Sequence, residues 1–245
     1  MAHLVIVTGG SSGLGRALID TAPPGSDLVD ISRSGHGGEH VRHIVADLAD
    51  PNSWQEAGEA IRAAVVERSW DRITLFHSAG MITPIGFVGE TDADEVTTNV
   101  LLNSASSQVL GHSYLAAVRG LEGRHELVLI SSGAGRRPIA AWATYCAGKA
   151  AGDLWVRSVG EEQQLRGGAM VLSVAPGVVG TPMQAEIRAT DPHDFPGVQR
   201  FRNLHEGGQL QAPEPTAMRL WSLLDQPALV TGSVLDLRDL PANLR

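Results

Sequence analysis

The sequence predicts a single α/β domain built on a parallel seven-stranded sheet that is doubly wound, with helices on both faces. Three observations predict this fold. Seven short apolar runs alternate with stretches that have helical spacing. Several of these runs are apolar on both faces, as strands covered by helices on each side must be. No linker, repeat or low-complexity segment interrupts the 245 residues, so we expect one domain over 1–245.

The expected elements follow one another in a regular order. Strands are predicted over 3–9, 26–32, 42–48, 72–80, 125–132, 169–177 and 232–237, because these runs are compact and rich in β-branched residues. Helices are predicted between them over 13–21, 51–68, roughly 93–119, 144–166 and 215–224. The second helix has clear start signals, with Asp50 or Asn52 as its cap and Pro51 in its first turn.

One segment departs from this alternation. Residues 182–212 are polar, contain prolines and glycines, and lie between the last two strands. A long excursion in a compact domain is typically a binding segment or a mobile connection. Because this one follows the carboxyl end of a strand, where open α/β sheets bind their ligands, we expect a lid over a substrate site.

Composition and charge exclude several classes of protein. A net charge of −8 without a basic tail argues against nucleic-acid binding and against polybasic contact with a membrane. The N-terminus lacks a basic leader region, and no window approaches about 18 consecutive apolar residues, so we expect a cytoplasmic protein without a membrane segment. The nine histidines lack metal-ligand spacing, so no metal is expected, and we interpret the single cysteine, Cys146, as a packing thiol.

A glycine-rich turn, TGGSSGLG at residues 8–15, follows the first strand and opens a helix. Its glycines allow a sharp turn and a close approach of the backbone to a pyrophosphate, and the helix N-terminus offers amide donors to the phosphates. We therefore predict a dinucleotide site in this turn. Its candidate contacts are Gly9, Ser11, Ser12, Gly13, Leu14 and Gly15.

The end of the second strand indicates which dinucleotide binds. Asp30 lies in this strand, but strand alternation and the two residues that follow favour Ser32 and Arg33 as the ribose contacts. A guanidinium binds a 2′-phosphate in a bidentate fashion. We therefore predict NADP(H) as the cofactor.

A tyrosine and a lysine lie four residues apart in the segment TYCAGKAAG, residues 144–152. On a helix, Tyr145 and Lys149 would share one face, about 6 Å apart along the axis. A nearby ammonium favours the phenolate and so lowers the pKa of a tyrosine, which suits a proton donor or acceptor near neutral pH. The structural alternative is a core tyrosine beside a lysine that extends to solvent.

Seven features in chain order resemble the classical short-chain dehydrogenases/reductases. They are TGGSSGLG, ADL at 46–48, HSAG at 77–80, Asn103, ISS at 130–132, YCAGK at 145–149 and APGVVGT at 175–181. Within that family, the segments around ISS, YCAGK and APGVVGT resemble the sepiapterin reductases and the similar bacterial benzil reductases. The resemblance implies a Rossmann fold, a nicotinamide cofactor and chemistry at a carbonyl group.

By this resemblance, Tyr145 would protonate the substrate carbonyl, and Lys149 would hold the nicotinamide ribose and lower the pKa of the tyrosine. Ser132, 13 residues before Tyr145, would hydrogen-bond the carbonyl oxygen. Ser131 is the alternative, but strand alternation should turn its side chain the other way.

The family also has an asparagine in the helix before the fifth strand, where it would position a proton-relay water. Asn103 fits the family spacing better than Asn99, which falls in the preceding helix. His77 and Ser78 stand where the family has two asparagines that brace the central strand, so altered local bonding is expected. Ser12 stands where many NADP-dependent members have an arginine.

Further cofactor contacts follow from the same resemblance. They are Asp47 and Leu48 at the adenine, Ser78, Ala79 and Gly80 near the adenosine ribose, Pro176, Gly177, Val179 and Thr181 at the nicotinamide end, and Tyr145 and Lys149 themselves.

The substrate would contact Ser132, Tyr145, Trp142, Met183, Gln184 and Asp236. In sepiapterin reductases a carboxylate near the C-terminus anchors the pterin ring, and Asp236 occupies the matching position. Trp142 is equally well explained as part of the core.

The expected activity is an NADPH-dependent reduction of a ketone, in particular of a vicinal dicarbonyl of the sepiapterin or benzil type. The alternatives are oxidation of a secondary alcohol and a non-catalytic NADP(H) sensor. Members of the family commonly pair helices like those near 100–119 and 144–166 across a two-fold axis, so a homodimer is expected, with a tetramer as the alternative.

Overall fold

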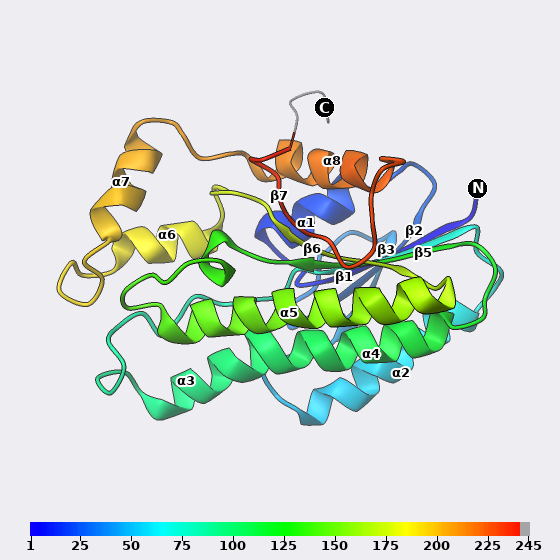
Figure 1. Cartoon of the computed structure of the whole chain (residues 1–245), viewed down its shortest axis with the longest axis horizontal. Helices are drawn as coiled ribbons and strands as arrows, with labels where there is room; N and C mark the ends of the chain where they lie inside the picture. Colours follow the sequence, from blue (N-terminus) through cyan, green and yellow to red (C-terminus); the bar gives the residue numbers. More distant parts are fainter. Residues whose placement is uncertain (241–245) are drawn as a thin grey trace.

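The computed structural model describes residues 1–240 of the chain and contains one seven-stranded sheet. The strands are β1 (His3–Thr8), β2 (Asp27–Ser32), β3 (Val41–Val45), β4 (Arg72–His77), β5 (Arg124–Ile130), β6 (Met170–Ala175) and β7 (Val234–Asp236). Every neighbouring pair is parallel, in the order β3-β2-β1-β4-β5-β6-β7 (Figure 1). The predicted parallel seven-stranded sheet is confirmed.

Helices cover both faces of this sheet, as predicted. On one face, α1 (Gly13–Asp20) packs against α8 (Pro213–Leu224). On the other lie α2 (Asn52–Val66), α4 (Ser106–Val118) and α5 (Ala143–Arg166), and α4 and α5 run along the sheet side by side (Figure 1).

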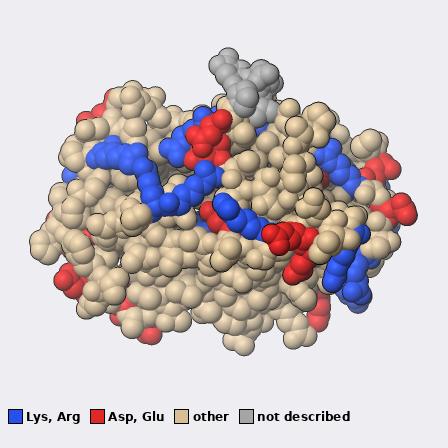
Figure 2. Space-filling model, viewed as in Figure 1, with Lys and Arg blue, Asp and Glu red and all other residues tan. Residues whose placement is uncertain are grey.

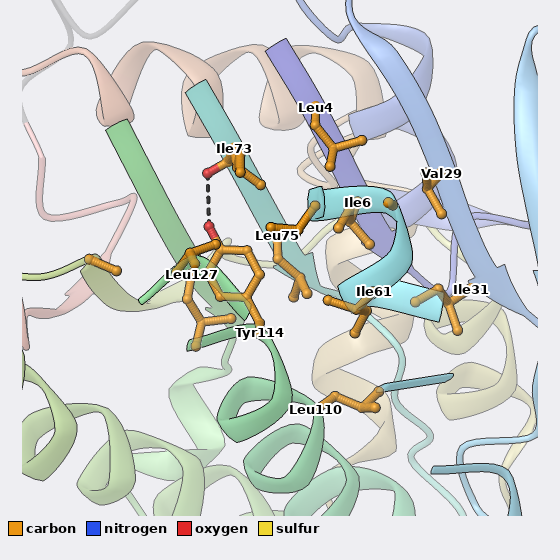
Figure 3. Packing of buried hydrophobic residues seen from close by; sticks show 14 of the residues in the cluster. Leu4, Ile6, Val29, Ile31, Ile61, Ile73, Leu75, Leu110, Tyr114 and Leu127 are labelled. Atoms are coloured by element: carbon orange, nitrogen blue, oxygen red, sulfur yellow. Dashed lines mark hydrogen bonds between the residues drawn. The ribbon is translucent and has the colours of Figure 1, made fainter. Parts of the chain in front are cut away.

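Strand alternation divides β1 between two hydrophobic cores. Leu4 and Ile6 belong to the core under α2, α4 and α5, whereas Val5 and Val7 belong to the core under α1 and α8. Figure 3 shows the first core, in which Ile61 of α2 packs with side chains of several strands. Each strand contributes side chains to the hydrophobic cores on both sides of the sheet, and it is therefore apolar on both faces.

The predicted helix over 93–119 is divided into three parts. α3 (Ala93–Val100) passes into a π-helical turn, η1 (Leu101–Ala105), which continues as α4. A π-helical turn widens the hydrogen-bond ladder locally and is frequent at functional sites. The π-helical turn contains the same residue types as an ordinary helix, so the sequence pattern did not predict it.

The helices expected from the sequence left out 182–212, but two short helices lie there. They are α6 (Pro182–Ala189) and α7 (Val198–Glu206). Pro182 at the first helical position is a start signal that the sequence analysis did not use. Few residues of the segment are buried, Ile187, Phe195 and Val198 among them, so apolar periodicity was too weak to predict helices.

The chain order of the strands reverses between β1 and β4, since β2 and β3 lie on one side of β1 and the later strands on the other. In open α/β sheets, ligands bind at such a point, in the crevice beyond the carboxyl ends of the strands. Both the glycine turn after β1 and the HSAG segment at the end of β4 lie there. Within residues 1–240, no helix is long and apolar enough to span a membrane.

Candidate active site

The four predicted catalytic residues come from three elements that meet near the carboxyl edge of the sheet. Ser132 follows β5, Tyr145 and Lys149 lie one turn apart on α5, and Asn103 lies in η1. The Ser132 side chain lies close enough to the Tyr145 phenol to lower its pKa against the larger effect of burial. Ser131 points elsewhere, because its Oγ donates to a buried carboxylate of α5 at 2.7 Å. The structure therefore places Ser132, rather than Ser131, beside the tyrosine.

Tyr145 is only 7% exposed, and burial raises the pKa of its phenol to about 12, against the opposing effect of the Ser132 hydrogen bond. The lowered pKa predicted from Lys149 is wrong for this structure. Desolvation by burial is the largest cause of the raised pKa. Lys149 Nζ lies 5.7 Å from the centroid of the tyrosine ring and donates to the Ile130 carbonyl at 2.9 Å. At neutral pH the phenol keeps its proton.

Lys149 is the single lysine of the sequence, in which arginines supply the other basic side chains. A guanidinium stays charged in proteins, whereas a buried ammonium readily shifts its pKa. Burial lowers the pKa of Lys149 to about 8, and the charge of Asp153 opposes this shift. The amine at this position therefore titrates near neutral pH, which an arginine would not do.

Asn103 is 4% exposed and binds the backbone that follows β4. Its Nδ2 donates to the Met81 carbonyl at 2.8 Å and to Asn99 Oδ1 at 2.9 Å, and its Oδ1 accepts from Met81 N at 3.2 Å. A Cβ on Gly148 would lie 3.0 Å from Asn103 Cβ, and one on Gly80 would lie 3.0 Å from Asn103 Oδ1. The mid-helix glycine of α5 is thus explained by the close approach of η1.

Asp153, one turn beyond Lys149 on α5, is a site residue that the sequence analysis missed. It is 7% exposed, and its Oδ1 accepts hydrogen bonds from Ser131 Oγ at 2.7 Å and Ser173 Oγ at 2.5 Å. Asp153 and Lys149 both line a polar cavity of about 10 Å³, close to the smallest volume that holds one water molecule. The spacing of four residues from Lys149 was the available signal.

Replacing Asp153 with Asn is expected to lower the pKa of Lys149 below its value of about 8, because a neighbouring negative charge is lost while burial remains. A chain with one lysine gives a single side-chain signal after ¹³Cε-lysine labelling, so an NMR titration measures this pKa directly. Ser173→Ala, which removes one hydrogen bond to Asp153 and keeps its charge, should leave the titration near wild type. An unchanged Lys149 pKa in Asp153→Asn would contradict the expected influence of the carboxylate.

His77 and Thr8 brace the turn after β4, where the family has asparagines. His77 Nδ1 lies 3.2 Å from Thr8 Oγ1, and the Thr8 oxygen accepts from the backbone N–H groups of Ser78 and Ala79, each at 3.1 Å. Burial lowers the pKa of His77 to about 3, so the imidazole is neutral. The turn is therefore held by the side chains of His77 and Thr8, and Ser78 contributes its backbone N–H.

The glycine turn has the backbone shape that a dinucleotide cradle needs. Gly9 and Gly13 have φ values of +72° and +54°, in the region that favours glycine. A Cβ on Gly15 would lie 2.2 Å from the Gly9 carbonyl oxygen, so the helix packs too closely for any larger residue. The N-cap of α1, Ser12, makes no capping hydrogen bond through its side chain, which leaves the helix N-terminus to other acceptors.

The two predicted ribose contacts differ in exposure. Ser32 is buried; its Oγ donates to Asp30 Oδ2 at 2.8 Å and accepts from Gly35 N at 3.1 Å. Asp30 Oδ1 accepts from Gly10 N at 2.9 Å, so this buried carboxylate ties β2 to the glycine turn. Arg33 is exposed. Of the two predicted contacts, Arg33 alone presents its side chain to solvent.

Two of the other predicted cofactor contacts, Thr181 and Ala79, lie against the glycine turn. A Cβ on Gly13 would lie 3.2 Å from Thr181 Cγ2, and one on Gly9 would lie 2.9 Å from Ala79 Cα. The turns after β1, β4 and β6 are therefore in close contact. The remaining predicted cofactor contacts lie beyond the ends of β3, β4 and β6. They are Asp47, Leu48, Gly80, Pro176, Gly177 and Val179.

Trp142 connects the start of α5 to the segment 182–212. Its ring stacks on Phe195 at 4.9 Å and meets Tyr145 edge-on at 5.9 Å, and Met183 packs against the same cluster. Trp142 is 4% exposed and is therefore part of a core next to the site. Among the described residues, neither Trp142 Nε1 nor Gln184 Nε2 has a hydrogen-bond partner, although both atoms are buried.

Asp236 does not present a free carboxylate. It is 4% exposed, and Arg238 donates to Oδ1 from Nε at 2.9 Å and to Oδ2 from Nη2 at 2.6 Å. Burial alone would raise the pKa of Asp236, but the bonds from Arg238 outweigh burial and lower it, so the pair is ionised. The predicted role of Asp236 as a substrate anchor is not supported, because Arg238 occupies both oxygens.

A larger cavity, of about 380 Å³, lies apart from the catalytic residues. It opens between the loop after β4 and α6, and none of the predicted site residues lines it. The residues that line it are Thr83, Pro84, Ile85, Gly86, Phe87, Glu90, Thr91, Glu95, Glu186, Thr190 and Asp194.

Known proteins resemble this chain over most of its length. A family model described as short chain dehydrogenase matches residues 3–192. The chain is 32% identical over 242 residues to a benzil reductase ((S)-benzoin forming) from Bacillus subtilis (strain 168), with 97% of this chain and 99% of that protein covered. It is 31% identical over 258 residues to a sepiapterin reductase from Rattus norvegicus, with 96% of each covered.

Solved structures resemble the fold. A short-chain dehydrogenase/reductase from Saccharomyces cerevisiae matches with a TM-score of 0.84 and 24% identity, and the match covers 99% of this chain and 98% of that chain. At this identity the likeness establishes the arrangement of the elements, and the chemistry rests on the site.

Proposed function

Because the chain belongs to the short-chain dehydrogenase family, we propose that it is an NADPH-dependent carbonyl reductase that acts on a vicinal dicarbonyl. The observation that carries the proposal is the meeting of Ser132 and Tyr145, one turn from the buried amine of Lys149. The similarity to a benzil reductase and to sepiapterin reductases supports the substrate class, since benzil and sepiapterin both carry adjacent oxygenated carbons.

In this proposal the cofactor supplies a hydride to the carbonyl carbon. Tyr145 donates its phenolic proton to the carbonyl oxygen, and Ser132 Oγ donates a hydrogen bond to the same oxygen. A phenol whose pKa is about 12 is protonated at neutral pH, and the loss of its proton is energetically costly. The Lys149 ammonium would favour the tyrosinate left after proton transfer, because a positive charge stabilises a nearby negative one.

The residues around the glycine turn fit a nicotinamide dinucleotide. The positive-φ glycines and the uncapped N-terminus of α1 suit a pyrophosphate. Asp30, the acid of β2, is buried and bonded to Gly10 N and Ser32 Oγ, so it does not repel a 2′-phosphate at the surface. Exposed Arg33 would bind that phosphate, which favours NADP(H).

Arg33→Ala is expected to weaken NADPH binding by about tenfold to a hundredfold, because one charge-assisted contact to the phosphate is lost. NADH lacks this phosphate, so its Kd should stay near the wild-type value. Titration of both cofactors by protein fluorescence measures the two constants. Arg62→Ala, which removes an exposed arginine of α2, is the matched control. Equal losses for NADPH and NADH would contradict the assignment of Arg33.

We also propose that 182–212 acts as a lid and that the protein is a homodimer. Tyr145 is 7% exposed and shares a hydrophobic cluster with Ile187 of α6 and Val198 of α7, so movement of this segment would open a path to the phenol. Two apolar side chains on the outer surfaces of α4 and α5, Val109 and Leu154, are 38% and 66% exposed and would suit pairing of these helices.

The proposed activity is tested by NADPH consumption with benzil, 1-phenyl-1,2-propanedione and sepiapterin. Turnover of at least one of the three compounds is expected. NADPH binding without turnover of any of the three, and without NADP⁺ reduction by the corresponding alcohols, would contradict the proposal and favour a cofactor sensor. A sensor has no need of the filled catalytic positions, which is why we prefer the enzyme.

A further inference from the structure

Arg238 lies across the two turns that flank the predicted carbonyl site. Its Cγ and Cδ lie 3.6 Å from a Cβ built on Gly177, in the turn after β6. Its Nη2 lies 3.4 Å from a Cβ built on Gly133, the residue that follows Ser132. These distances are ordinary van der Waals contacts, so the Arg238 side chain packs against both turns.

The guanidinium is held in this position by a carboxylate. Three bonds connect Arg238 to Asp236, from the backbone N, from Nε and from Nη2, at 2.9, 2.9 and 2.6 Å. The Asp236 side chain is 4% exposed and that of Arg238 is 44% exposed. The buried Asp236 carboxylate therefore holds the Arg238 side chain in place, and the charged group that is exposed to solvent is the guanidinium. Figure 2 shows Lys and Arg side chains next to Asp and Glu side chains on the face that carries the end of β7.

Two buried donors, one at the start of α5 and one in α6, have no hydrogen-bond partner within residues 1–240. Buried Trp142 Nε1 and Gln184 Nε2 have no acceptor among the described residues, and the Trp142 ring lies 5.9 Å from that of Tyr145. A donor left unpaired in a buried place favours a ligand that brings an acceptor. A ligand that brings further N–H groups finds its natural partner, Asp236, already occupied.

We infer that Arg238 is a specificity-determining residue, which by occupying Asp236 makes the site select carbonyl-rich, acceptor-bearing substrates over those with an N–H-rich aminopyrimidine ring. The inference rests on the proposed function, because it narrows the substrate class of the same site. Benzil offers two carbonyl oxygens and no N–H groups. Sepiapterin carries an aminopyrimidinone ring, whose N–H groups pair with a free carboxylate.

The test compares benzil and sepiapterin in the full-length wild type, in Arg238→Ala and in Arg238→Gln. The wild type is expected to prefer benzil in kcat/KM. Arg238→Ala frees the Asp236 carboxylate and should shift the ratio toward sepiapterin by about tenfold or more. Arg238→Gln keeps much of the packing on Gly177 and removes the charge, so it should shift the ratio in the same direction. Arg166→Ala, at the far end of α5, is the control and should leave the ratio unchanged.

Binding separates this inference from the activity. Equilibrium dialysis of each compound against the NADP⁺-loaded protein gives the same comparison without turnover, and thermal unfolding reports whether each variant is folded. If neither compound is turned over, the proposed function fails, and the ratio of the two Kd values still decides the role of Arg238. Ratios in both arginine variants that stay within about twofold of wild type, against the tenfold expected, would overturn the inference.

Discussion

Tyr145→Phe is expected to lower kcat for carbonyl reduction by about 10²–10⁴-fold while NADPH binding stays close to wild type. The substitution removes only the phenolic oxygen, so the aromatic contact with Trp142 is kept and the proton donor is lost. Steady-state NADPH consumption with the best dicarbonyl measures kcat, and fluorescence titration measures the Kd of the cofactor. Loss of turnover together with tight NADPH binding would identify a chemical role.

The chain contains a matched control for this substitution, because it has only two tyrosines. Tyr114 is also fully buried, but its hydroxyl donates to the Ile73 carbonyl at 2.8 Å in the core under α4 (Figure 3). Tyr114→Phe should lower the free energy of unfolding by about 1 kcal/mol and leave kcat unchanged. If Tyr145→Phe instead retained full turnover, another group would be the acid.

Glu126→Ala is expected to lower the free energy of unfolding by about 3–5 kcal/mol. Glu126 of β5 is fully buried and accepts from Arg72 Nε at 3.1 Å and from Thr74 Oγ1 at 2.7 Å, and it also pairs with Arg124. Removing the acid leaves the side chain of Arg72, which is only 12% exposed, without its main buried partner. Urea denaturation of both proteins measures the difference.

The activity of Glu126→Ala provides a second readout. Glu126 lies near the amino end of β5 and Ser132 lies just beyond the carboxyl end, about 20 Å away along the strand. The kcat of the folded variant should therefore equal that of the wild type. Glu67→Ala, which breaks the exposed pair between Glu67 and Arg42, is the control and should unfold at the same urea concentration as wild type. If Glu126→Ala also unfolded at nearly the wild-type urea concentration, the structural role of the buried cluster of Glu126, Arg72 and Thr74 would be contradicted.

Two buried acids, Glu126 of β5 and Asp153 of α5, illustrate what residue patterns leave out. Glu126 and Asp153 sit in segments whose apolar neighbours correctly predict a strand and a helix. Their burial depends on partners far away in sequence, Arg72 for Glu126 and Ser173 for Asp153. No local pattern identifies such a partner, since the strands that bring the two together are paired only in the folded sheet.

The pairing of Asp236 was also hidden from the sequence pattern. The resemblance placed an acid at the right position of the C-terminal strand, and the acid is there. Whether its oxygens are available depends on Arg238, two residues later, whose side chain folds back to bond both of them. The pKa of Tyr145 also depends on the folded structure. The lysine four residues later predicts a lowered pKa, but burial raises it to about 12.

The sequence by itself determined the parallel doubly wound sheet, the family and the spacing of Ser132, Tyr145 and Lys149. These follow from local periodicity and from motifs in a set order, which the chain carries whether or not it is folded. The tertiary structure decided which serine faces the tyrosine, which acids are free, and the direction of each pKa shift. Those properties depend on burial and on partners distant in sequence, because desolvation and hydrogen bonding act through space and are set only when the layers pack.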